Sequence, residues 1–113
     1  MKTIDSVNPY SGVPLESYPA FDLTTLDTTL IAGVGAQRQW SLTADAARTS
    51  VLMALAQQLR QQQERLARLA TLEMGKTLAS ARAEIEKCAW VCEYYAEHGP
   101  AMIAEESVAG DDD

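Results

Sequence analysis

The sequence predicts a mostly α-helical fold that begins with a short β-hairpin. Apolar residues recur every three or four positions from residue 23 to about residue 98, a spacing typical of amphipathic helices. Residues 1–21 are instead rich in Pro, Gly, Ser and Tyr. A chain of 113 residues has room for one small domain at most. Because its apolar helix faces exceed what it can cover by itself, we expect an incomplete portion of a larger fold.

The hairpin is predicted from a turn at residues 8–12. In Asn8-Pro9-Tyr10-Ser11-Gly12, Pro fixes φ, Gly accepts a positive φ, and Asn can bond to its own backbone. The second strand follows, with Leu15, Ser17 and Pro19 alternating with Glu16, Tyr18 and Ala20. An isolated two-stranded ribbon is marginal in water, so the hairpin needs a sheet or helix to pack against.

A first helix is predicted from Asp22, where the spacing of apolar residues becomes helical. Its apolar stripe contains Leu23, Leu26, Leu30 and Val34, and its candidate caps are Asp22, Thr24 and Thr25. Gly33 and Gly35 each cost about 1 kcal/mol relative to Ala inside a helix, so we expect them to interrupt it. Trp40 is expected to anchor the helix end.

A second helix is expected after Ser41, with Thr43 or Asp45 as its cap. Its apolar stripe contains Val51, Leu52, Leu55 and Leu59. A break is expected within residues 60–64. A third helix then continues the apolar face to Gly75, a residue type that suits a helix C-terminus, through Leu66, Leu69 and Leu72.

A fourth helix is predicted from about Thr77 to His98. One of its faces carries Ala81, Ile85, Cys88, Ala89, Cys92 and Tyr95. Gly99-Pro100 is expected to end this helix, because Pro lacks a backbone N–H. Residues 1–104 are expected to form the folded part, and residues 105–113 an acidic, solvated and disordered tail.

The charge of the chain argues against nucleic acid and membrane surfaces as partners. The formal net charge is -7, and five carboxylates lie in residues 105–113, which leaves about -2 for residues 1–104. Neither part offers a basic face for phosphate or anionic lipid. The sequence shows no apolar run for a signal peptide and no membrane span. We therefore expect a soluble, cytoplasmic chain.

Cys88 and Cys92 are the only cysteines. Four residues apart on a helix, they have poor geometry for a mutual disulfide, and a reducing compartment fits them. A nucleophilic thiol needs an activating base, but Lys87 is the nearest basic residue and His98 the only histidine. Two cysteines and one histidine on one helix match no common zinc pattern. We expect both cysteines to pack in the helix face and His98 to cap a helix end.

The other candidate motifs are incomplete. Gly33-x-Gly35 is part of a dinucleotide-loop pattern, but Arg38 stands where the third glycine belongs and no long strand leads in. Glu73-Met74-Gly75-Lys76 has the Gly-Lys of a phosphate loop without its upstream glycine. Glu84 and Glu86 are typical of a solvent face. The sequence therefore assigns no catalytic, cofactor-binding or metal-binding residue.

Taken in order, these residues resemble the N-terminal region of the aldehyde dehydrogenase superfamily. Asn8-Pro9-Tyr10-Ser11-Gly12 matches its Asn-Pro-x-Thr/Ser-Gly turn, and the run to Trp40 matches its first helix. Arg48 with Val51-Leu52 is similar to its Arg-x-x-x-Leu pattern. Leu72-Glu73-Met74-Gly75-Lys76 matches its Glu-x-Gly-Lys signature.

Two further stretches, 81–87 and 94–102, follow in register and are most similar to bacterial succinate-semialdehyde dehydrogenases. The resemblance covers about residues 7–104. The chain departs from the family at Gly33-Val34-Gly35, where the family is usually Ala-rich, and at Thr77, where proline often follows Gly-Lys.

The resemblance implies residues 1–104 of an α/β, Rossmann-like enzyme in which a β-element and helices pack around the coenzyme domain. The implied reaction oxidises succinate semialdehyde to succinate: a cysteine thiolate attacks the aldehyde, hydride passes to NAD or NADP, and the thioester is hydrolysed. The family motifs for this chemistry match no position here, and Glu84 only lies near a family position linked to a cation site. We therefore expect the chain to be inactive alone and to hold no cofactor.

Two interpretations remain open. In the first, the chain is a fragment of the dehydrogenase, and its partner is the missing C-terminal part of the enzyme. In the second, it is a helical interaction module that forms a homo-oligomer or docks on intact dehydrogenase subunits. Both follow from apolar helix faces that need a covering surface.

Overall fold

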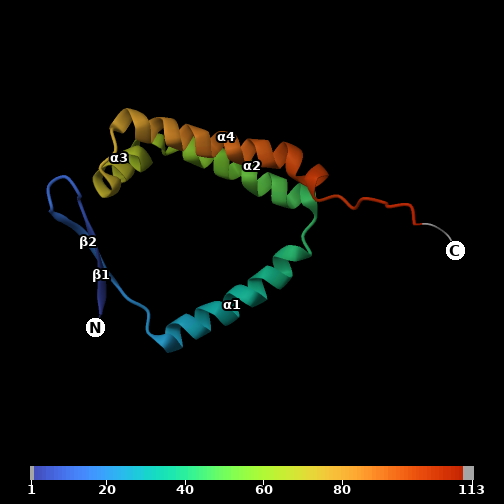
Figure 1. Cartoon of the computed structure of the whole chain (residues 1–113), viewed down its shortest axis with the longest axis horizontal. Helices are drawn as coiled ribbons and strands as arrows, with labels where there is room; N and C mark the ends of the chain where they lie inside the picture. The colour runs from blue at the N-terminus through green and yellow to red at the C-terminus, as the bar shows by residue number, and fades with distance from the viewer. Residues whose placement is uncertain (1, 111–113) are drawn as a thin grey trace.

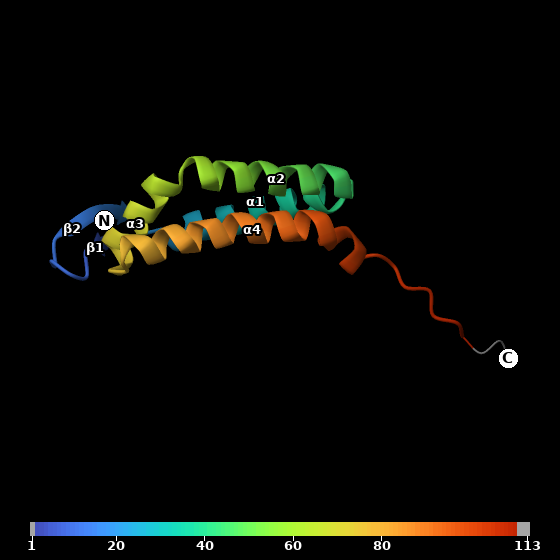
Figure 2. The same ribbon diagram turned by 90° about the horizontal axis from the view of Figure 1, so that it is seen from above.

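The chain folds into a hairpin followed by four helices, in a computed structural model that describes residues 2–110 (Figure 1). The elements are β1 (Thr3–Val7), β2 (Pro14–Pro19), α1 (Leu23–Ser41), α2 (Asp45–Gln61), α3 (Gln63–Met74) and α4 (Leu78–Met102). The predicted mostly helical fold with an N-terminal hairpin is confirmed. Helices α2 and α4 lie antiparallel and side by side (Figure 2), whereas α1 runs apart from them (Figure 1).

The hairpin forms where the turn chemistry predicts it. Its two strands are antiparallel, with Thr3 opposite Pro19 and an irregularity beside Val7. In the turn, the Asn8 side-chain oxygen accepts a hydrogen bond from the Tyr10 backbone N–H at 2.9 Å. Gly12 adopts a φ of 71°, in the left-handed region that glycine tolerates best.

Helix α1 runs unbroken through Gly33 and Gly35, so the predicted interruption is wrong. Each glycine weakens a helix but still donates its backbone N–H, and neither therefore ends it. Asp22 is the N-cap, since its carboxylate accepts from the Thr25 N–H at 2.7 Å. This bond holds the pKa of Asp22 below its usual range. All residues of α1 are exposed, and Trp40, 47% exposed, does not anchor the helix end as predicted.

Helix α2 begins without a side-chain cap, because Ala44 occupies the N-cap position. The two predicted caps have other partners. The Thr43 hydroxyl donates to the Trp40 carbonyl at 2.6 Å and so closes the end of α1. The Asp45 carboxylate forms an ion pair with Arg48, one turn further along the helix.

The ends of α2 and α3 lie where the sequence predicts them, but the end of α4 does not. Gln62 separates α2 from α3, inside the interval predicted for a break, and Gly75 ends α3 with a φ of 71°. Helix α4, however, does not end at Gly99-Pro100 but continues to Met102. Pro100 deletes a single hydrogen bond near the end of a long helix, and the Ile103 N–H still closes the last turn on the Gly99 carbonyl at 3.2 Å.

The packed core lies where α4 contacts α2 and α3, and its buried apolar side chains are alanines. We call these residues the alanine seam: Ala56, Ala67, Ala81, Ala89 and Ala96. Alanine lets two helices approach closely, but each residue buries little apolar area. The half-buried residues Leu52, Leu59 and Ile85 flank the seam.

The apolar faces predicted from the sequence are only partly covered. On α4, Ala81 and Ala89 are buried, but Cys88 is exposed and Tyr95 is 50% exposed. The prediction that Cys88 packs in the helix face is therefore wrong, because α2 and α3 cover only a narrow strip of α4. Four further predicted stripe residues are also largely exposed: Val51, Leu55, Leu69 and Leu72.

The molecule is extended for its length. Its radius of gyration is 20.2 Å, whereas a compact chain of 113 residues has about 13 Å. It exposes 9194 Å², whereas a folded monomer of 12.3 kDa exposes about 6,100 Å². The excess of about 3,000 Å² is surface that this chain does not cover by itself.

Residues 105–110 contain no helix or strand and are exposed, while the predicted acidic tail continues into residues 111–113, which lie outside the described residues. Within residues 2–110, no helix has the length and apolar character needed to cross a membrane.

Candidate functional site

The turn after β1 and the end of α3 lie against each other, so two motifs far apart in the sequence meet. The Ser6 hydroxyl donates to Glu73 Oε1 at 2.8 Å. A Cβ atom at Gly75 would stand 3.1 Å from Pro9 Cγ, and the positive φ of Gly75 also favours glycine there. The hairpin thus packs on the end of a helix, which supplies the support that a two-stranded ribbon needs.

Arg60 of α2 bridges two carboxylates of α4. Its Nη2 lies 2.9 Å from Glu86 Oε1 and 2.9 Å from Glu93 Oε2, and its Nη1 also donates to Glu93. Hydrogen bonding to Arg60 lowers the pKa of Glu93, and bonding to Glu93 and Glu86 raises the pKa of Arg60. This double pair ties α2 to α4 along the alanine seam.

Two further ion pairs hold the other end of α4. Arg82 Nε lies 2.6 Å from Glu64 Oε1 on α3, and Lys76 pairs with Glu84. Hydrogen bonding to Arg82 lowers the pKa of Glu64. Glu84 is exposed, as a solvent face implies, but its carboxylate is matched to a cation. These carboxylates therefore serve packing and are poorly placed for acid–base chemistry.

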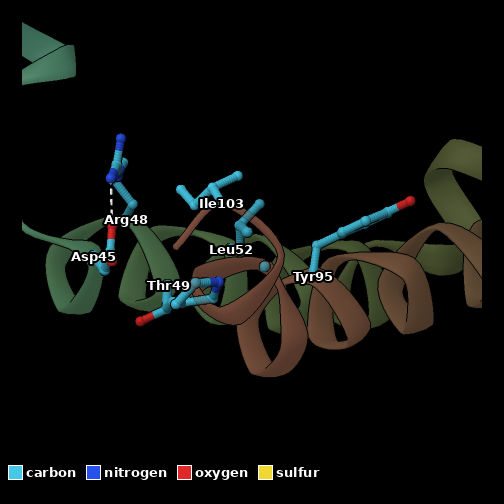
Figure 3. Close-up of a pocket in the computed structure, with 8 residues that line it drawn as sticks. Asp45, Arg48, Thr49, Leu52, Tyr95 and Ile103 are labelled. Atoms are coloured by element: carbon cyan, nitrogen blue, oxygen red, sulfur yellow. Dashed lines mark hydrogen bonds and ion pairs between the residues drawn. The ribbon is translucent and has the colours of Figure 1, made fainter. Parts of the chain in front are cut away.

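A cavity of about 230 Å³ lies between the beginning of α2 and the end of α4 (Figure 3). Leu52 and Ile103 form part of its apolar wall, with Tyr95 at one end and the Asp45–Arg48 pair at the other (Figure 3). Small-molecule sites usually have roughly 300–1,000 Å³ and several converging polar groups. Since Asp45 and Arg48 bind each other, this cavity suits an apolar side chain better than a nucleotide.

The cysteines and the histidine lie along α4 without forming a catalytic pair. His98 follows Cys88 by ten residues, or about 15 Å along the helix axis, too far to accept a proton from that thiol. Its ring instead contacts Tyr94, with centroids 4.6 Å apart. Because α4 continues past His98, the predicted capping role is wrong. Across residues 2–110, no cluster of three or more His, Cys, Asp and Glu side chains is placed to hold a metal ion.

The glycine motifs also lack the geometry of phosphate loops. Gly33 and Gly35 lie in the middle of α1, where backbone N–H groups bond within the helix. Gly75 lies at the C-terminal end of α3, and Lys76 beside it pairs with Glu84. A phosphate site needs N–H groups at the beginning of a helix, so neither motif forms one.

A row of aromatic side chains on α4 was not predicted, although its four-residue spacing can be read from the sequence. Trp90, Tyr94 and His98 follow each other at intervals of four, so their side chains form a row on one helix face. The Trp90 and Tyr94 ring centroids are 6.0 Å apart, and Tyr95 meets Tyr94 edge to face at 5.3 Å. This aromatic row is largely exposed and adds to the uncovered surface.

The hairpin and helices match part of a larger enzyme of known structure. An Escherichia coli NADP dependent enzyme of known crystal structure superposes on 98% of this chain, with a TM-score of 0.88 and 32% identity. The family model for the aldehyde dehydrogenase family matches residues 1–113. The chain therefore belongs to the aldehyde dehydrogenase family.

Two curated relatives of this chain are named for different aldehyde substrates. The NAD(P)+ succinate semialdehyde dehydrogenase Sad of Escherichia coli (strain K12) is 37% identical over 101 residues, or 89% of this chain. The 3,6-anhydro-alpha-L-galactose dehydrogenase of Streptomyces coelicolor is 32% identical over 108 residues, or 91% of the chain. The chain spans only 22% of the length of each relative and 23% of the solved structure.

Proposed function

We propose that this chain is the N-terminal segment of an NAD(P)+-dependent succinate-semialdehyde dehydrogenase and is not catalytic by itself. Two observations together support the proposal: the chain closely matches part of a solved enzyme, and it leaves a large surface exposed. The chain superposes on 98% of its length, yet it exposes 9194 Å² where a compact monomer exposes about 6,100 Å². The remainder of the enzyme is the partner that fits this surface.

The chemistry of the described residues supports a non-catalytic role. Oxidation of an aldehyde to an acid needs a nucleophile for the carbonyl carbon, an acceptor for the hydride, and a base that activates water. His98 lies about 15 Å from Cys88 along α4. The carboxylates of Glu86 and Glu93 on α4 are paired with Arg60, and that of Glu64 on α3 is paired with Arg82. We therefore assign nucleophile, base and NAD(P)+ site to the part of the family enzyme that this chain does not span.

The choice of substrate rests on the relatives. Succinate semialdehyde is favoured because the Escherichia coli relative shares 37% of its residues over the matched region, against 32% for the 3,6-anhydro-alpha-L-galactose enzyme. A cytoplasmic location belongs to the same proposal, and the free thiols of Cys88 and Cys92 support it.

The test is a reconstitution. The chain is co-expressed with the part of the Escherichia coli relative that lies beyond the matched region, and reduced nicotinamide is measured with succinate semialdehyde. We expect activity only when both pieces are present. Gly75→Val, which places a side chain against Pro9, is expected to reduce it, and Gly33→Ala, a glycine with open space around it, is the matched control.

Two outcomes would contradict the proposal. Production of reduced nicotinamide by the purified chain alone would show that it is catalytic. Two pieces that co-purify as a folded complex and still fail to oxidise any aldehyde would show that the chain does not complete the enzyme.

A further inference from the structure

We propose that the contact between the hairpin and the end of α3 is a latch, which holds α1 in position so that this helix closes on the rest of the enzyme as a strap. We call this contact the hairpin latch. It consists of the Ser6–Glu73 hydrogen bond and of the packing of Pro9 on Gly75. The inference rests on the proposed function for the partner of α1 and adds how this chain prepares α1 for that partner.

Helix α1 is held at its two ends rather than along its length. All of its residues are exposed, and it runs apart from α2 and α4 (Figure 1). Residues 20–22 join it to β2, and residues 42–44 join it to α2. Three residues span at most about 11 Å, so each end of α1 stays close to the element that it joins. The position of α1 therefore depends on whether β2 and α2 are themselves fixed.

The two ends are fixed by contacts of different strength. At the α2 end, Ala56 is buried against α4, and Arg60 bridges two carboxylates of that helix. At the hairpin end, the contact with α3 is the hairpin latch, a single partly buried hydrogen bond of 2.8 Å and one proline ring against a glycine. A contact this small opens and closes while α2 and α4 stay packed.

The lengths of the helices fit a frame that the latch closes. Helix α1 has 19 residues and is about 28 Å long, and α2 has 17 residues and is about 26 Å long. The two helices meet at residues 42–44, and the hairpin lies beside α3 at the opposite end of α1 (Figure 1). The latch thus joins residues that are 67 positions apart. When it opens, the hairpin and α1 become one arm on a three-residue link.

A closed latch favours the partner of α1 by preorganisation. A surface that covers α1 must fix this helix relative to α2, α3 and α4, and fixing a mobile arm costs conformational entropy. With both ends of α1 held, most of that entropy is already lost before the partner arrives. Because coupling between two binding events is reciprocal, a partner that covers α1 also favours the closed latch.

The first experiment tests the latch in the full 113-residue chain alone. Spin labels are placed on Thr24→Cys in α1 and Lys87→Cys in α4, with both native cysteines replaced by serine. We expect one narrow distribution of label distances, and loss of that narrow peak in Glu73→Ala, which removes the acceptor of the Ser6 bond. Glu73→Gln is the matched control, because its amide oxygen still accepts.

A second variant opens the latch without touching the hydrogen bond. Gly75→Val places a side chain against Pro9 and is expected to broaden the distances as Glu73→Ala does. Circular dichroism of each variant shows that α2, α3 and α4 remain helical. A distribution that stays narrow in both Glu73→Ala and Gly75→Val would overturn the proposal.

The second experiment tests the consequence for assembly. A tagged chain is co-expressed with the part of the Escherichia coli relative that lies beyond the matched region, and the amount of that part that co-purifies is measured. We expect Glu73→Ala to recover at least about tenfold less of it than Glu73→Gln does. Equal recovery by these two variants would overturn the proposal. If the wild-type chain recovers none, the proposed function fails, whereas the label distances still decide whether the latch holds α1.

Discussion

Helices α1 and α2 are of similar length, with 19 and 17 residues, but only α2 packs against another helix of this chain. Both helices carry large apolar side chains. Leu30, Ile31 and Val34 of α1 are exposed, whereas α2 buries Ala56 and half-buries Leu52 and Leu59. Apolar content alone therefore does not decide which helix is covered. Close backbone approach and matched ion pairs, such as those of Arg60, distinguish α2 from α1.

The two helices also differ in what keeps them helical. An isolated helix of this length is marginal in water, and α1 contains two glycines. Local support comes from the Asp22 cap, whose carboxylate accepts from the Thr25 N–H at 2.7 Å. Helix α2 gains tertiary contacts in addition. We therefore expect backbone amides of α1 to exchange with solvent faster than those of α2.

The largest effect is expected from enlarging a seam residue. Ala89→Leu adds three carbon atoms at a fully buried position between α4 and its neighbours, and we expect a loss of about 1–3 kcal/mol in the free energy of unfolding. The matched change on α1, Ala36→Leu, is expected to be nearly neutral because that position is exposed. Urea unfolding followed by circular dichroism measures both. Equal effects would show that the seam is not the stabilising contact.

The next largest effect is expected at two glycines, where substitution by alanine should change the free energy of unfolding in opposite directions. Gly75→Ala introduces a Cβ atom at a positive φ and 3.1 Å from Pro9, so we expect a loss of about 1–2 kcal/mol. Gly33→Ala on α1 meets open space and is expected to gain up to about 1 kcal/mol. Thermal unfolding of the two variants shows whether each change stabilises or destabilises the chain. Stabilisation by Gly75→Ala would contradict the packing of the hairpin on α3.

A smaller effect is expected from acid, and it should weaken the contacts of α4 with α2 and with α3. The pKa values of Glu64 and Glu93 are lowered in the folded chain by hydrogen bonds from Arg82 and Arg60. Their contribution to stability is therefore present above the unfolded Glu pKa of about 4.3 and is lost as the pH falls through the lower folded value.

Thermal unfolding midpoints measured from neutral to acid pH test this expectation. In Arg60→Gln we expect a smaller drop on acidification, since the bond that lowers the pKa of Glu93 is gone. Arg65→Gln is the control, because the Arg65 guanidinium donates to Gln62, which does not titrate. If both variants follow the wild-type curve, Arg60 does not couple α2 to α4 in solution.

The smallest effect is expected at the hairpin. Ser6→Ala removes the 2.8 Å bond to Glu73 and should cost about 1 kcal/mol, seen as faster amide exchange in β1. Ser17→Ala removes a bond of 2.6 Å to Asp5, which lies inside the hairpin and does not reach α3. If Ser17→Ala alone loosens the hairpin, its stability is internal and the contact with α3 is secondary.

Local chemistry made much of the fold predictable. The turn at residues 8–12, the Asp22 cap and the helix end at Gly75 depend on single residue types with known backbone preferences, and all three are confirmed. The break near Gln62 is also confirmed. Errors arose where a local signal was weak relative to its neighbours: two glycines did not break α1, and Pro100 did not end α4.

Contacts between distant segments could not be predicted from one sequence. Periodicity shows which helix face is apolar, but it does not show which part of that face a neighbour covers. Cys88 and Tyr95 share a helical stripe with Ala89 and are nevertheless exposed. The partners of Arg60, 26 and 33 residues away, were equally invisible. The aromatic row of α4 could have been found from its spacing alone.

The alanine seam also has a genetic consequence. A single-base change in an alanine codon yields serine, threonine, valine, proline, glycine, aspartate or glutamate. At a helix position such as Ala89, with no exposed surface, most of these add volume, introduce a charge or break the helix, and glycine weakens it. A random single-base mutation in a seam codon therefore seldom gives a tolerated residue, whereas at the exposed positions of α1 no packing within this chain restricts side-chain size.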